Sequence, residues 1–157
     1  MPRLDTTPIA VIARLGRLQA YVGAEVEALF AEHGLTRQSW DVLASLRRSG
    51  PPYRLTPTEL RALLMRTSGA ITHTLHRLEY MGLVERVRNA DDGRSLLVGL
   101  TAKGRSLVGR LGPVHLANER RLLGPLTGDE QETLAALLRK LLVAFERESA
   151  TPPGRVV

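Results

Sequence analysis

Two signals for the start of a helix lie close together in the middle of this chain, and they leave room for only one short helix between them. Residues 56–59 combine a capping threonine, a proline at the first helical position and a glutamate three residues after the cap. A second cap follows at Thr67 or Ser68, and Gly82 supplies a left-handed stop. The spacing predicts a short helix to about Met65, a tight turn and a second helix.

Apolar residues at helical spacing indicate which side of each short helix faces a core. In the first helix they are Leu60, Leu63 and Leu64, and in the second they are Ile71, Leu75 and Leu78. Helical periodicity places a polar set on the opposite side of the second helix, with almost no acidic residue in it. This set consists of Ser68, Gly69, Thr72, His73, His76 and Arg77.

A β-hairpin is predicted directly after these helices. Residues 83–88 and 95–100 are two β-rich runs, and residues 89–94 between them contain Asn, Asp and Gly, which favour turns. Residues 53–55, before the first short helix, are a candidate for a further, very short strand.

Two helices are predicted ahead of this central part. Thr7-Pro8 is a capping hydroxyl followed by proline, and apolar residues then recur at spacings of three and four as far as Gly34. Thr36 caps the second helix, which ends at the Ser-Gly-Pro-Pro of residues 49–52.

Two more helices are predicted after the hairpin. Thr101 caps the first, which we expect to be interrupted or kinked near Gly112-Pro113, and residues 127–130 form a capping box that begins the second. The second carries a wide apolar stripe that needs a partner helix: Leu134, Leu137, Leu138, Leu141, Leu142 and Phe145. Burial between two subunits would cover this stripe, so the sequence predicts a homodimer.

A short helix, a tight turn, a second helix and a hairpin form the layout of a winged helix-turn-helix. The predicted fold class is therefore mainly α with a small β-hairpin wing (α+β), with dimerisation helices at the N- and C-terminal ends. We expect the DNA-binding winged helix-turn-helix to cover residues 35–100. Residues 1–34 and 101–148 would form the helical dimerisation region, and residues 149–157 a disordered tail.

Charge and side-chain chemistry favour double-stranded DNA as the partner of the central part. The chain has 22 Lys and Arg against 16 Asp and Glu, a net charge of +6. Hydroxyls and N–H groups at the electropositive start of the second short helix suit phosphates, and polar side chains further along suit base edges. Arginines of the hairpin suit a second stretch of backbone. The predicted DNA-binding residues are Thr67, Ser68, Gly69, Thr72, His73, His76, Arg77, Arg86, Arg88 and Arg94.

Other classes of protein are disfavoured by what the sequence lacks. The absence of cysteine excludes disulfides and thiolate metal sites. Nucleophile elbows, phosphate loops and paired-carboxylate motifs are missing, so we expect neither an enzyme nor a cofactor. The chain has no apolar run long enough to span a bilayer and its start lacks the pattern of a signal peptide, so we expect no membrane partner and a cytoplasmic protein.

The wing carries a specific pattern, Asp91-Asp92-Gly93-Arg94-Ser95 followed by a β-run that ends in Leu100-Thr101-Ala102-Lys103-Gly104. With this pattern and the helices before it, residues 35–105 resemble the MarR family of bacterial transcriptional regulators. The flanking helices are similar to the family's dimerisation region in length and order. The resemblance implies an obligate dimer, a palindromic operator, and release from DNA when a small phenolic or anionic molecule binds.

Within that family, two segments are most similar to the urate-responsive branch: Asp5-Thr6-Thr7-Pro8, and the stretch from Trp40-Asp41-Val42-Leu43 through Gly50-Pro51-Pro52-Tyr53-Arg54-Leu55-Thr56-Pro57. Asp41 and Arg94 correspond to two ligand-linked positions of that branch. Two other positions differ, because this chain has no tryptophan near its N-terminus and has Thr74 where the branch has a basic residue.

An effector pocket is expected where the first two helices meet the DNA-binding part. Cationic and aromatic groups there suit a small anionic or phenolic molecule. The candidates are Arg14, Arg17, Tyr21, Trp40 and Asp41. Each also has a structural alternative: a core position for Trp40, an ion pair for Asp41, and solvation or pairing across the dimer for the arginines.

Two alternatives to effector release stay open. His73, His76 and Glu79 recur along one helix, with His33 and His115 as possible additions, and such side chains suit a divalent metal ion. Their spacing turns the third residue well away from the first, however, and the same side chains suit DNA. A dimer that binds DNA constitutively is the second alternative.

Overall fold

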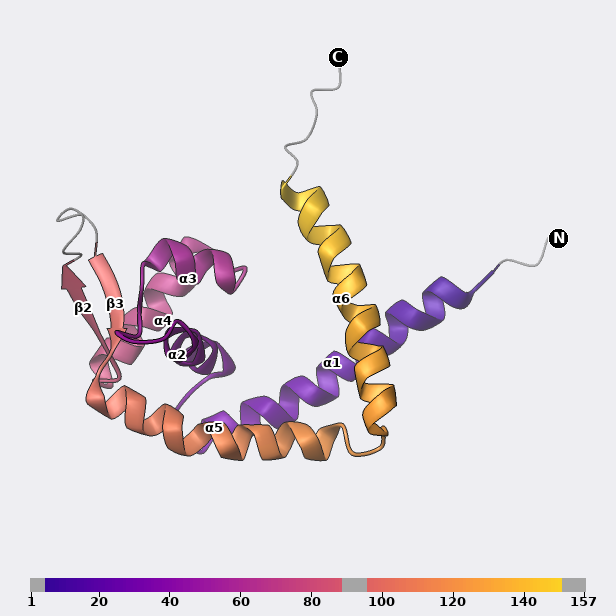
Figure 1. Ribbon diagram of the computed structural model, residues 1–157, viewed down its shortest axis with the longest axis horizontal. Coiled ribbons are helices and arrows are strands. Elements are labelled where there is room, and N and C mark those ends of the chain that lie inside the picture. The colour runs from indigo at the N-terminus through magenta and orange to yellow at the C-terminus, as the bar shows by residue number, and fades with distance from the viewer. Residues whose placement is uncertain (1–4, 89–95, 151–157) are drawn as a thin grey trace, which may run out of the picture. The chain divides into compact units, whose positions relative to one another are not determined.

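The computed structural model describes residues 5–88 and 96–150, with side chains described as far as residue 147. In these residues the fold is mainly helical with a small antiparallel sheet, as predicted (Figure 1). The elements are α1 (Thr7–Ala31), α2 (Arg37–Arg48), β1 (Arg54–Leu55), α3 (Pro57–Leu63), α4 (Ser68–Tyr80), β2 (Val84–Arg88), β3 (Leu96–Leu100), α5 (Ala102–Leu122) and α6 (Gly128–Ala150). The chain divides into two compact units, residues 1–118 and 119–157.

The caps that begin the two short helices are confirmed. Thr56 Oγ1 accepts a hydrogen bond from the Glu59 N–H (3.1 Å), and Glu59 Oε2 accepts one from the Thr56 N–H (2.7 Å). This reciprocal pair forms the expected capping box, and the Thr56 N–H lowers the pKa of the Glu59 carboxyl because it stabilises the ionised form. At α4, Thr67 Oγ1 accepts from the Ala70 N–H at 3.3 Å.

The beginning of α1 and the end of α3 differ from the prediction. Thr6, not Thr7, is the N-cap of α1, because Asp5 Oδ1 accepts the hydrogen bond of the Thr7 N–H at 2.9 Å. Helix α3 ends at Leu63 rather than Met65, since Met65 adopts a positive φ of 50° that turns the chain toward α4.

Of the two predicted outcomes for α5 near Pro113, an interruption or a kink, the interruption does not occur, because the helix continues through Pro113. Proline costs about 3 kcal/mol in a helix interior. Burial of Val108 and Leu111 on the same helix offsets this cost. Helix α6 extends to Ala150, so residues 149–150 are helical and not part of a tail, consistent with the high helix propensity of alanine. The rest of the predicted tail, residues 151–157, lies outside the described residues.

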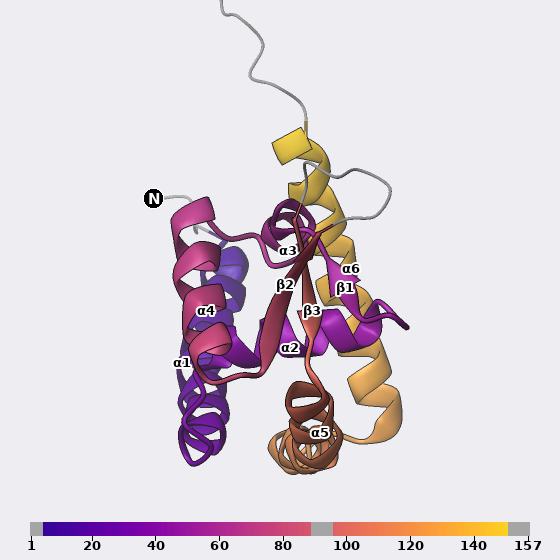
Figure 2. The same ribbon diagram turned by 90° about the vertical axis from the view of Figure 1, so that its left-hand side faces the viewer.

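The hairpin and the short strand are confirmed. Strand β3 lies between β1 and β2 and pairs antiparallel with both, as the three neighbouring strands in Figure 2 show. Val84 is opposite Leu100 in the β2–β3 pair, and Leu55 is opposite Val98 in the β1–β3 pair. The predicted turn, residues 89–94, lies outside the described residues.

The core of the first unit forms where the two short helices, the sheet and α2 meet. Ile71, Leu75 and Leu78 of α4 are at most 1% exposed, as predicted. In α3, Leu60 is fully buried and Leu64 half-buried, but Leu63 is 63% exposed. The prediction for Leu63 is wrong because α3 has only two turns, and only its Leu60 side packs on the core.

Thr101 and Gly104 join the hairpin to α5. Thr101 Oγ1 donates to the Gly82 carbonyl (2.8 Å) and accepts from the Gly104 N–H (3.0 Å). A Cβ at Gly104 would overlap the Leu83 carbonyl oxygen, so this position requires glycine for close backbone approach. In the segment Leu100-Thr101-Ala102-Lys103-Gly104, the spacing of the threonine and the glycine therefore follows from this junction: the threonine hydroxyl bonds to the glycine N–H, and the glycine leaves space for the Leu83 carbonyl.

Candidate DNA-binding surface

The outward side of α4 is polar and exposed. The side chains of Thr72, His73 and His76 are exposed, while Ile71 and Leu75 on the other side of the helix are buried. Thr67, Ser68 and Gly69 at the start of the helix are exposed as well. These residues lie where the sequence predicts a reading surface, and their hydroxyl and imidazole groups are able to bond to phosphates or base edges.

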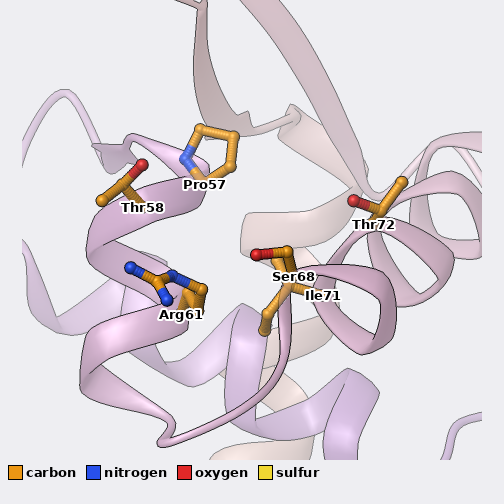
Figure 3. A pocket seen from close by; sticks show the side chains of 6 residues that line it. All are labelled: Pro57, Thr58, Arg61, Ser68, Ile71 and Thr72. Carbon is orange, nitrogen blue, oxygen red and sulfur yellow. The ribbon is translucent and has the colours of Figure 1, made fainter.

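A small notch of about 90 Å³ lies between α3 and α4 (Figure 3). Its lining combines three hydroxyls, one guanidinium and two apolar residues: Thr58, Ser68, Thr72, Arg61, Pro57 and Ile71. The close-up shows Thr58 and Arg61 on α3 across from Ser68 and Thr72 on α4. Donors on both walls, beside the electropositive start of α4, suit an anionic oxygen such as that of a phosphate.

Sequence reasoning missed two residues of this surface. Thr58 and Arg61 belong to α3, the first helix of the helix-turn-helix, and both line the notch. The first helix of such a motif crosses the DNA backbone, so a polar side chain on its outer side is the signal that would have identified Arg61.

Two of the predicted DNA-binding arginines have partners within the protein. Arg77 Nη2 donates to the Gly34 carbonyl oxygen at 2.9 Å. Arg86 Nε donates to Glu79 Oε1 at 2.9 Å, and this ion pair, about 30% exposed on each side, joins the wing to α4. The structure therefore directs both guanidinium groups toward neighbouring elements.

Arg88 and Arg94 are the two remaining predicted positions. Arg88 is exposed on β2, whereas Arg94 lies outside the described residues. Thr74, which stands where the urate-responsive branch has a basic residue, is 4% exposed, and its hydroxyl donates to the Ala70 carbonyl at 2.9 Å. Thr74 thus belongs to the core side of α4.

Trp40 is part of an aromatic cluster in the core. It is 6% exposed, stacks on Phe30 with ring centroids 5.1 Å apart, and meets His115 of α5 edge-on at 5.5 Å. Asp41, next to it on α2, is half-buried. Trp40 therefore occupies a core position, which is the structural alternative to a role in effector binding.

Burial raises the pKa of the Asp41 carboxyl above its usual value. The positive charges of Arg37, Arg66, Arg48 and His115 oppose this rise. Desolvation is the larger effect, so the ionised form of Asp41 lowers the stability of the fold.

The other three candidate effector residues lie on α1, nearer to its N-terminal end than Phe30. Arg14, Arg17 and Tyr21 are exposed, and Arg14 Nη1 donates to the Ala10 carbonyl of its own helix at 3.0 Å. Arg14 precedes Phe30 by 16 residues, about 24 Å along a helix. Within one chain the structure therefore does not bring Arg14 beside Trp40.

In the alternative with a divalent metal ion, Glu79 would be the third ligand beside His73 and His76. In the structure the Glu79 carboxylate is paired with Arg86 instead. Across residues 5–88 and 96–147, no three His, Asp or Glu side chains gather as a metal site would require. None of the described helices is long and apolar enough to cross a membrane.

An exposed polar recognition helix, a basic notch beside it and an adjoining antiparallel hairpin define a DNA-binding protein of the winged helix-turn-helix class. Comparison with known proteins agrees, because residues 33–95 match the MarR family. The HTH-type transcriptional regulator PecS of Dickeya dadantii is 34% identical over 140 residues, which cover 89% of this chain and 84% of PecS. The multiple antibiotic resistance protein MarR of Escherichia coli is 35% identical over 136 residues, 83% of this chain and 92% of that protein.

A solved structure shows the same likeness. The crystal structure of a mutant MarR from E. coli complexed with operator DNA has a TM-score of 0.76 and 30% identity to this chain, covering 88% of this chain and 99% of that one. The chain therefore belongs to the MarR family of transcriptional regulators. PecS is a transcriptional regulator, not an enzyme.

The notch leads to a prediction for Arg61. A phosphate contact carries no sequence information, so Arg61→Ala should weaken binding to all DNA sequences by a similar factor. In a plot of log affinity against log salt concentration, the negative slope should become less steep by about one unit. Arg110→Ala is the control, since Arg110 is exposed on α5 and donates to Ser106 Oγ at 2.7 Å. Altered preference at a single base pair in the Arg61 variant would assign base reading to this residue instead.

Proposed function

We propose that this protein is a homodimeric repressor that binds a palindromic DNA operator and is released by a small anionic or phenolic molecule. The observation that carries the proposal is the exposed polar side of α4 beside the basic notch formed by Thr58, Arg61, Ser68 and Thr72. Two such surfaces, related by a two-fold axis, fit half-sites about one helical turn apart. Because its partner is chromosomal DNA, we place the protein in the cytoplasm, with no catalytic role.

The dimer is supported by apolar residues that a single chain leaves in solvent. On α1, Ile9 and Ile12 are 68% and 66% exposed. On α6, none of the residues with described side chains is buried; Leu137 and Phe145 are 58% and 63% exposed. Apolar surface of this extent marks an interaction site, which we assign to a second copy of the chain. The proposed dimerisation region comprises residues 1–34 and 101–148, and the DNA-binding region residues 35–100.

Selection of DNA fragments from a random pool by the purified protein tests the proposal. We expect the selected fragments to contain a palindrome whose half-sites are about 10 base pairs apart from centre to centre. Enrichment without any palindrome, or no enrichment, would refute binding as a symmetric dimer.

The effector is proposed to bind near Trp40 and Asp41 on α2. The support is the set of positive charges around Asp41, which attracts an anion, and the aromatic cluster beside it. Assignment to the urate-responsive branch is part of the proposal and rests on Asp41 and on the segments that resemble the branch, at residues 5–8 and 40–57. Binding there weakens DNA affinity if the bound state favours another spacing of the two recognition helices.

Asp41→Asn separates an effector role from a structural one. The pKa of Asp41 is higher in the folded than in the unfolded chain, so its contribution lowers stability once pH rises through the unfolded value of 3.8. The variant should therefore have a higher free energy of unfolding at pH 7, with the difference shrinking as pH falls toward 3.8. Urea unfolding at several pH values measures this.

In the same variant, we expect the response to effector to be lost. Trp40 is the only tryptophan, so its fluorescence reports on the site. Salicylate and urate are the probes, and quenching and operator release are followed in parallel. A more stable variant that responds like the wild type would remove Asp41 from the effector site.

A further inference from the structure

The C-terminal half of the recognition helix α4 is held by three other elements of its unit. Each contact is a polar bond from a long side chain, and each lies outside the exposed reading side. The bonds are Arg77 Nη2 to the Gly34 carbonyl (2.9 Å), Arg86 Nε to Glu79 Oε1 (2.9 Å) and Lys103 Nζ to the Met81 carbonyl (2.7 Å). They connect α4 to the end of α1, to the wing and to the start of α5, respectively.

Gly34, the acceptor for Arg77, has a fixed position at the end of α1. Its φ of 68° is left-handed, and its N–H donates to the Ala31 carbonyl at 2.9 Å. The next N–H, that of Leu35, donates back to the Phe30 carbonyl at 3.0 Å, which completes a Schellman-type cap. Gly34 itself is exposed, but the cap is anchored to the core on both sides, because Phe30 and Leu35 are buried and Phe30 stacks on Trp40.

A second observation places the same two helix ends close together. If Gly34 carried a Cβ, that atom would lie 4.0 Å from the methyl carbon of Met81, the C-cap of α4. The end of α1 therefore lies beside the end of α4, with Arg77 as the hydrogen-bonding group between them. A cation at the C-terminal end of α1 is also favoured by the dipole of that helix.

Arg77 and Glu79 hold α4 from opposite flanks. Two residues apart on a helix, their side chains point about 160° away from each other. Arg77 reaches α1 on one flank and Glu79 reaches the wing on the other. The side between them, which carries Thr72 and His76, stays exposed.

From this arrangement we infer that Arg77 is a positioning residue, not a base-reading one: it couples the recognition helix to α1 and so fixes the separation of the two recognition helices in the dimer. The inference rests on the proposed function, in which the exposed apolar residues of α1 lie in the dimer interface. Helix α1 then carries the dimer contacts, and the cap that follows its last residue carries the acceptor for Arg77. Loss of the Arg77 bond would let α4 move relative to α1 without altering the side chains that face DNA.

The test compares operators that differ only in half-site spacing. On the operator selected by the wild type, and on versions with one or two base pairs inserted at its centre, the wild type should lose affinity steeply with each insertion. Arg77→Met removes the donor and keeps the aliphatic stem. We expect the variant to bind the original operator about tenfold more weakly than the wild type does. The factor by which its affinity falls with each inserted base pair should be several-fold smaller than for the wild type, and its base preferences should be the same.

Two control variants distinguish positioning from other roles. His76→Ala alters the reading side and should relax base preference without changing the spacing penalty. Arg88→Met removes a wing charge and should lower affinity for all spacings equally. Urea unfolding shows whether each variant is folded. If Arg77→Met does not fold, Arg77→Gln takes its place, because the glutamine side chain is too short to reach Gly34.

An altered preference at one base position with an unchanged spacing penalty would overturn the inference and assign base reading to Arg77. An unchanged spacing penalty with unchanged base preference would overturn it as well. Failure of the proposed function is a separate result, because the wild type would then select no palindromic operator at all.

Discussion

Replacing Gly104 by alanine will lower the free energy of unfolding by about 3 kcal/mol, because the added methyl group has no space. The Cβ would overlap the carbonyl oxygen of Leu83, which is backbone and cannot rotate away. That carbonyl also accepts hydrogen bonds from the Thr101 N–H (3.2 Å) and hydroxyl (3.3 Å), so its displacement disturbs the junction of hairpin and α5. Urea unfolding at fixed protein concentration measures the loss.

Gly109→Ala is the matched control on the same helix. No atom lies within 4 Å of a Cβ built there, and Gly109 is exposed. Alanine is favoured over glycine in a helix interior, so this variant should be more stable by about 0.5–1 kcal/mol. Equal stability changes in the two variants would contradict a steric origin for the Gly104 effect.

Leu137→Glu will convert the protein to a monomer and reduce operator affinity by about 100-fold or more. Leu137 is 58% exposed on α6 in the single chain, and the proposed dimer buries it. A carboxylate there would have to lose its water in the interface, which is unfavourable without a partner charge. Without the dimer, each half-site is bound independently, and the gain from linked binding is lost. Sedimentation and operator titration measure the two effects.

The control is Ala136→Glu, which adds the same charge one residue earlier. Ala136 is exposed and lies beside Arg139 and Lys140, on the side of α6 opposite the apolar stripe. A glutamate four residues before a lysine stabilises a helix slightly. This variant should stay dimeric and bind the operator like the wild type. A dimeric Leu137→Glu variant with normal operator affinity would remove α6 from the interface.

The types and order of the elements could be predicted because their signals are local. A capping box such as the one at Thr56 and Glu59 involves residues three apart, and the burial of Ile71 and Leu75 follows from helical periodicity. Two predictions differ from the structure at points where neighbours outside the pattern contribute. Asp5 Oδ1 accepts the Thr7 N–H at the start of α1, and α5, which buries Val108 and Leu111, continues through Pro113.

The candidate site was predictable only in part. The exposure of Thr72, His73 and His76 follows from the position of the core side of α4. Arg61 was missed because its place beside Ser68 depends on the angle at which α3 meets α4. No local pattern encodes that angle.

Local sequence patterns were enough to predict a winged helix-turn-helix between long amphipathic helices, a basic net charge and a resemblance to the MarR family. Caps, periodicity and composition act over a few residues, and they do not require knowledge of distant contacts. The partners of Arg77 and Arg86 could be identified only from the folded chain: Arg77 bonds to Gly34, 43 residues away, and Arg86 pairs with Glu79 across the helix–strand junction. A guanidinium group at the end of a long flexible stem takes its partner from whatever the fold brings within reach, and the distances that decide this exist only once the chain has folded.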